Sequence, residues 1–69
     1  MDNTADSLRK FSSDNGVGFE TLAKAAGMDL STFYRKMKKG KKAFTVGDVL
    51  GMVDGGVMPR EDAIRIFLT

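Results

Sequence analysis

Apolar residues recur three or four positions apart along most of this chain, and polar residues fill the positions between them. This spacing places the apolar side chains on one face of a helix. It predicts helices at about residues 4–14, 19–26, 29–39, 46–54 and 59–68, of which the first four are each followed by glycine or turn residues. No stretch has a convincing strand pattern. The expected fold class is therefore all-α, a compact five-helix bundle in one domain over residues 1–69.

Residues that favour helix ends support these boundaries. Thr4, Asp29 and Thr45 are expected N-caps, because their side-chain oxygens can accept a hydrogen bond from a free backbone N–H. Thr45 with Asp48 forms an approximate capping box. Glycine can take the left-handed conformation that ends helices. The predicted core positions on the helices are Ala5, Leu8, Phe11, Leu22, Ala23, Ala26, Phe33, Met37, Val46, Val49, Leu50, Val53, Ile64, Phe67 and Leu68, with Phe44 between two helices.

Two of the predicted helices, 19–26 and 29–39, are separated by a tight turn at Gly27. Ala23 is small enough for another helix to approach closely, and the bulky Phe33 follows the glycine by six residues. These offsets favour a helix-turn-helix, whose second helix enters the major groove of DNA. The alternative is an ordinary helical hairpin whose basic face only interacts with solvent.

Positive charge is concentrated after this turn. The chain has eleven basic and nine acidic residues, for a net charge of +2. Residues 35–42 contain six of the eleven basic residues and no acidic residue, so the rest of the chain has five basic residues against nine acidic ones. Such local charge attracts a polyanion. Lysines bind phosphates better than they read bases, and the predicted phosphate contacts are Lys36, Lys38, Lys39, Lys41 and Lys42.

Several function classes lack support in the composition. The chain has no cysteine and no histidine, which excludes disulfides and the usual zinc-ligand sets. No acid pair or phosphate-binding glycine motif is convincing, so we expect no enzyme activity, cofactor, metal or small-molecule ligand. No apolar run reaches the roughly 18 residues of a membrane span, and the N-terminus lacks a signal-peptide pattern. We expect a cytoplasmic protein.

The turn segment also resembles a known family. Its pattern L-A-x-x-x-G-x-D-x-S-T-[apolar]-x-R is similar to the lambda-repressor-like, or Cro-type, helix-turn-helix of phage and bacterial regulators. This resemblance implies a five-helix domain that binds double-stranded DNA as a transcriptional regulator or repressor, in a bacterial or phage-infected cell. The matching residues are Leu22, Ala23, Gly27, Met28, Asp29, Ser31, Thr32, Phe33 and Arg35, with Gly40 closing the helix.

By position, the resemblance implies that the start of the third helix faces the bases. Arg35 could bond to guanine through two hydrogen bonds, and Ser31 could bond to bases or phosphate. Leu30 and Tyr34 also lie near the apolar stripe, so a place in the core or at its rim is the alternative for these two. The complete set of expected base contacts is Leu30, Ser31, Thr32, Tyr34 and Arg35.

One residue departs from the family pattern. The second helix of the family usually begins with a glutamine that contacts phosphate, whereas this chain has Phe19. Phe19 could be part of the core or an apolar contact for a partner. It leaves open an alternative function, a protein-binding module on the same fold such as a phage inhibitor or antirepressor.

Regulators of this type usually bind DNA as dimers. The fifth helix has more apolar residues than one inward face needs, which suggests a homodimer surface. The alternative is that this helix simply caps the core. The expected dimer residues are Val57, Met58, Ile66, Phe67 and Leu68.

Overall fold

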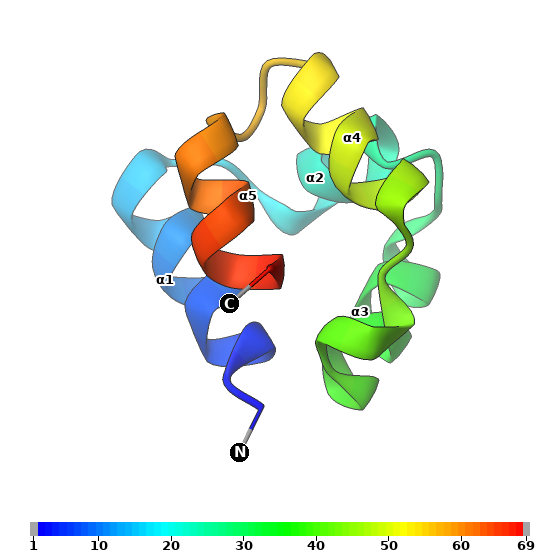
Figure 1. The fold of residues 1–69 in the computed structure, drawn as a ribbon. Coiled ribbons are helices and arrows are strands. Elements are labelled where there is room, and N and C mark those ends of the chain that lie inside the picture. The colour runs from blue at the N-terminus through cyan, green and yellow to red at the C-terminus, as the bar shows by residue number, and fades with distance from the viewer. Residues whose placement is uncertain (1, 69) are drawn as a thin grey trace.

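The computed structural model describes residues 2–68, and these residues form five α-helices, one 3₁₀ turn and no strand (Figure 1). The all-α prediction is confirmed. Helix α1 lies beside α5, α2 contacts both α3 and α4, and α3 occupies one corner of the bundle. No helix within these residues is long and apolar enough to cross a membrane. The elements are α1 (Thr4–Asn15), α2 (Phe19–Ala25), α3 (Leu30–Lys39), η1 (Lys41–Ala43), α4 (Val46–Asp54) and α5 (Arg60–Phe67).

The start of α1 differs from the prediction. Thr4 is the first helical residue and is buried, so it is not the N-cap. The backbone N–H of Thr4 instead donates to Oδ1 of Asp2 at 2.9 Å. Asp2 therefore takes the role expected of Thr4, accepting a bond from a backbone N–H that has no partner within the helix.

The first three helices contribute the core faces that the spacing predicts. Leu8, Phe11, Leu22, Phe33 and Met37 are all buried in one apolar cluster. Ala23, on α2, is also in this cluster, and Phe44 fills the core from the segment after η1. The ring of Phe44 lies 5.6 Å from that of Phe33 and 5.0 Å from that of Phe67. This aromatic row joins α3 to α5 across the core.

Two of the four predicted inward positions of α4, Val46 and Leu50, are wrong. Val46 is 75% exposed and Leu50 is 52% exposed, while Met52, which was not in the predicted stripe, is fully buried. Val49 and Val53 are half-buried against the cluster, as expected of a face that includes position 52. The helix is thus rotated relative to the prediction, and its outer surface carries apolar side chains.

Gly51 explains how α4 can take this orientation. A Cβ atom at this position would lie 2.5 Å from the carbonyl oxygen of Ala25, a backbone atom that cannot move aside easily. Glycine therefore allows α4 to pack directly on the end of α2.

The predicted inner face of α5 also needs correction. Ala63, Ile66 and Phe67 are buried, whereas Ile64 and Leu68, which were predicted in the core, are exposed.

Candidate nucleic-acid interface

Helix α3 begins and ends at residues suited to those positions. Oδ1 of Asp29 accepts a hydrogen bond from the Thr32 backbone N–H at 2.9 Å, which confirms Asp29 as the N-cap. The turn before it contains Gly27 with a φ of 79°, and the helix ends at Gly40 with a φ of 98°. Both values lie in the left-handed region that favours glycine. The two glycines thus set the length and the direction of α3.

The inner face of α3 is fixed by apolar contacts. Phe33 is fully buried and Met37 nearly so, as the spacing predicts. The ring of Phe33 also lies 5.9 Å from that of Phe19 on α2. Because these side chains fix the rotation of α3 about its axis, they also decide which residues face outward.

The outer face of α3 contains most of the predicted base contacts. Ser31, Tyr34 and Arg35 are exposed, whereas Leu30 and Thr32 are half-buried. The Ser31 hydroxyl donates to Oδ1 of Asp29 at 3.3 Å, and Nη2 of Arg35 donates to Oγ1 of Thr32 at 3.3 Å. These two bonds hold the Ser31 and Arg35 side chains along the helix surface, near its N-terminal half.

Phe19 occupies a position between the two alternatives stated for it. It is half-buried, and its ring contacts core residue Phe33 as well as the exposed Tyr34, whose ring lies 5.8 Å away edge-on. Phe19 therefore belongs to the rim of the core. Its ring positions that of Tyr34. With Phe19 as its first residue, α2 lacks the polar side chain that is usual at this position in the family that the motif resembles.

Basic side chains continue along α3 beyond these residues. Lys38 and Lys39 are exposed, and the sequence of α3 contains no acidic residue. Lys42 is exposed and Lys41 half-buried in η1, directly after the helix. A surface hollow of about 320 Å³ lies between α3 and η1, lined by Thr32, Arg35, Lys36, Lys39 and Ala43. The structure thus gathers most of the predicted phosphate contacts at the C-terminal end of α3.

Lys36 is the exception among these lysines. Its Nζ lies 2.6 Å from Oδ2 of Asp48 on α4, and the two side chains are only 24% and 12% exposed. Burial opposes ionisation of Asp48, but the bonds from Lys36 and Thr45 outweigh it and lower the pKa of this carboxyl group. Sequence reasoning found Asp48 only as part of a capping box, because the contact spans twelve residues and two elements.

A second carboxylate at the end of α3 was also missed. It belongs to Asp2, which lies just before α1 in the sequence. Oδ2 of Asp2 accepts a hydrogen bond from the Lys41 backbone N–H at 2.9 Å. The side chain and the backbone N–H of Thr4, together with the backbone N–H of Lys41, lower the pKa of Asp2 to about 2. Asp2 therefore links the start of α1 to the basic end of α3.

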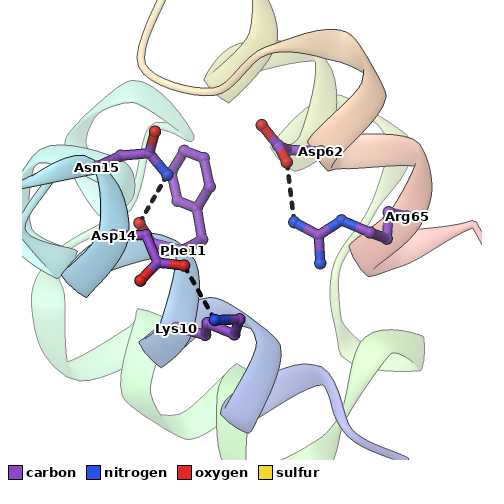
Figure 2. Close-up of polar contacts among 6 residues, drawn as sticks. All are labelled: Lys10, Phe11, Asp14, Asn15, Asp62 and Arg65. Atoms are coloured by element: carbon purple, nitrogen blue, oxygen red, sulfur yellow. Dashed lines mark hydrogen bonds and ion pairs between the residues drawn. The ribbon is translucent and has the colours of Figure 1, made fainter.

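The charges on α1 and α5 are arranged differently (Figure 2). Lys10 pairs with Asp14 at 3.2 Å and Arg65 with Asp62 at 2.8 Å, each pair within one helix. The side-chain amide of Asn15 bonds to a carbonyl of its own helix, that of Phe11. These helices offset their own charges locally, whereas α3 cannot do so.

The predicted dimer residues are mostly not at the surface. Met58, just before α5, and Ile66 and Phe67, on α5, are buried in the core, which is the arrangement expected of a helix that caps it. Val57 is half-buried and only Leu68 is well exposed. The exposed apolar surface lies instead on α4 and the end of α5, around a hollow of about 210 Å³. That hollow is lined by Lys41, Phe44, Thr45, Val46, Val49, Leu50, Phe67 and Leu68.

The fold and this surface define a small all-α domain with a basic, outward-facing third helix. No protein-family model, curated protein or solved structure matches the chain. Residues 2–68 also place no three His, Cys, Asp or Glu side chains in a group that could hold a metal ion.

Proposed function

We propose that this chain is a sequence-specific regulator that binds double-stranded DNA, of the lambda-repressor-like type, with α3 in the major groove. One observation carries the proposal: Phe33 and Met37 are buried on one face of α3, and Ser31, Arg35, Lys38 and Lys39 are exposed on the other. A helix with its side chains is about 10–12 Å wide, and the major groove is about 12 Å wide. Such a protein would act in the cytoplasm of a bacterial or phage-infected cell.

The residues that would contact bases lie in the first six positions of α3, residues 30–35. Arg35 can form two hydrogen bonds to guanine once its bond to Thr32 is exchanged, and Ser31 can bond to a base edge. Leu30 and Thr32 are half-buried, so they offer less surface, for example to a thymine methyl group. Tyr34 is held edge-on by Phe19, and its hydroxyl suits a phosphate.

The lysines at the C-terminal end of α3 and in η1 would provide most of the affinity for DNA. Lys38, Lys39, Lys41 and Lys42 lie on α3 and η1. If each neutralises one phosphate, the logarithm of the association constant should fall against the logarithm of salt concentration with a slope of roughly −4. Fluorescence anisotropy with a labelled duplex between low and moderate salt measures this slope. Lys38→Met should reduce its magnitude by about 0.9, while Lys10→Met, on α1, should not. A flat salt dependence of the unmodified protein would contradict the proposal.

Sequence specificity is tested separately through Arg35. Selection of bound DNA from a random pool gives the preferred site, and the Arg35→Ala variant is then titrated against that site and against single-base variants. We expect a loss of about 1–3 kcal/mol of binding free energy and relaxed preference at one base pair. Equal weakening on every duplex would make Arg35 a phosphate contact only.

A protein-binding module is the second candidate, and the exposed apolar surface of Val46, Leu50 and Leu68 favours it. Isolated exposed apolar residues are common, but a contiguous group rimmed by polar residues is typical of an interaction site. If two copies bind a pseudo-palindromic site about one helical turn apart, this surface is also available for their contact. No binding to any duplex at low salt, together with self-association or capture of a protein partner lost in Leu50→Ser, would favour this candidate over DNA binding.

A further inference from the structure

The contact between Lys36 and Asp48 differs from three other ion pairs among residues 2–68. Its Nζ–Oδ2 distance is 2.6 Å, and both side chains are largely covered. The pairs Arg9–Asp6, Lys10–Asp14 and Arg65–Asp62 join residues three or four apart in one helix and are more exposed. Exposed pairs of that kind contribute little to stability. The Lys36–Asp48 pair instead connects α3 to α4.

Asp48 is itself held in place by the start of α4. Its Oδ2 also accepts a hydrogen bond from the Thr45 backbone N–H at 2.9 Å, and its own N–H donates to Oγ1 of Thr45 at 3.0 Å. These bonds complete the capping box. The carboxylate therefore has a fixed position before Lys36 approaches it. Helix α3 packs mainly on α2 and η1. The Lys36–Asp48 pair adds a direct polar connection from α3 to α4.

We propose that Asp48 is a positioning residue for DNA binding, which holds Lys36 away from the phosphates and fixes the orientation of α3. The inference rests on the proposed function. Moving Lys36 to a phosphate would leave the carboxylate of Asp48 covered and short of a charged partner, which is costly. Lys38 and Lys39 are exposed on the same helix and reach a phosphate without that cost. Lys36 thus affects DNA affinity by fixing the orientation of α3. We therefore no longer expect it to contact a phosphate.

Lys39 provides the matched comparison. It has the same side chain, lies three residues further along α3, and lines the same hollow as Lys36. It is exposed, whereas Lys36 is half-buried. A phosphate contact and a positioning residue leave different traces in a salt titration. Loss of a phosphate contact changes the slope, because one counterion fewer is released. Loss of a positioning residue displaces the line in parallel and keeps the slope.

The experiment compares Lys36→Met, Lys39→Met, Asp48→Asn and the double variant Lys36→Met/Asp48→Asn. The salt slope on one fixed duplex is measured well below every melting temperature, and Tm is measured without DNA. We expect Lys39→Met to reduce the magnitude of the slope by about 0.9 with little change in Tm. We expect Lys36→Met to keep the slope of the unmodified protein, to weaken binding by a similar factor at every salt concentration, and to lower Tm by roughly 4–8 °C. The Tm losses of the two single variants, added together, should exceed the Tm loss of the double variant, because each single substitution already removes the same contact.

Three results would overturn the inference while leaving DNA binding intact. They are a slope reduced as much by Lys36→Met as by Lys39→Met, Tm losses that add in the double variant, and unchanged affinity of Lys36→Met at every salt concentration. If Asp48→Asn does not fold, the slope and the affinity of Lys36→Met decide alone. Absence of salt-dependent binding by the unmodified protein would overturn the proposed function, and this inference with it.

Discussion

The α2–α3 half of the molecule and the α4–α5 half are both short helical pairs, yet they differ in how side-chain type relates to position. On α3 the apolar Phe33 and Met37 are buried, and the charged Arg35, Lys38 and Lys39 are exposed. On α4 the apolar side chains surround the helix, so that Met52 is buried while Val46 and Leu50 are exposed. Charge thus marks the outer face of α3, and no comparable mark exists on α4.

This difference shows what sets the orientation of a helix in a small bundle. Burial of a charged helix face costs much free energy. The charged residues of α3 must therefore face outward, and the rotation of this helix follows from its sequence. A helix that is apolar on several faces can rotate at little cost in burial, and close contacts then decide. In α4 the deciding contact is the one between Gly51 and the carbonyl of Ala25.

The largest expected effect separates the buried face of α4 from its exposed one. Met52→Ala should destabilise the protein by about 2–5 kcal/mol, because it leaves a cavity in the core. Leu50→Ala, two residues away on the same helix and 52% exposed, should change stability by less than about 1 kcal/mol. Urea unfolding followed by circular dichroism measures both. A larger loss for Leu50→Ala than for Met52→Ala would restore the face predicted from the sequence.

A smaller effect tests the close contact itself. Gly51→Ala should destabilise by about 1–3 kcal/mol, since its new methyl group would overlap the Ala25 carbonyl and force α2 and α4 apart. Gly47→Ala is the matched control, because its methyl group would meet only Oγ1 of Thr45 at 3.6 Å, an ordinary contact. We expect it to stabilise α4 by about 0.5–1 kcal/mol. Equal effects of the two substitutions would mean that packing on Ala25 does not restrict α4.

The sequence was a good guide to local structure. Asp29 as N-cap, Gly40 at the end of α3, and the Thr45–Asp48 capping box depend on bonds between near neighbours, and the structure confirms them. The end of α2 lies one residue earlier than expected, at Ala25. The rotations of α4 and α5 could not be derived in this way, because they depend on the shape of a surface built by other helices.

The candidate site divides along the same line. The exposure of Ser31, Arg35, Lys38 and Lys39 follows from the period of α3 and was predicted. The ion pair between Lys36 and Asp48 was not, since these two residues belong to different elements. Neither was the place of Asp2 beside Lys41, 39 residues away. Contacts between elements require the positions of both, which helical periodicity does not supply.

The smallest expected effect concerns acid, and it returns to α3, because three carboxylates with lowered pKa values surround this helix. The Thr32 hydroxyl and backbone N–H lower the pKa of Asp29 at its start. Asp2, with a pKa of about 2, lies at its end, and Asp48, also lowered, is paired with Lys36. All three are ionised in the folded protein at pH values where an unfolded aspartate, with a pKa of about 3.9, begins to bind a proton. Their stabilising contribution is therefore complete above the unfolded pKa and is lost as the pH falls through each folded pKa.

We accordingly expect a Tm that is nearly constant from about pH 8 to 5 and falls between about pH 4 and 2, measured by circular dichroism at fixed ionic strength. The absence of histidine from the chain removes the side chain that ordinarily titrates between those upper values. Asp29→Asn separates charge from capping, because asparagine is about as good an N-cap as aspartate but does not titrate. This variant should keep most of its Tm at pH 7 and show a shallower decline in acid. A decline as steep as that of the unmodified protein would assign the acid sensitivity to Asp2 and Asp48, and so to the contacts that join α3 to α1 and α4 rather than to the start of α3 itself.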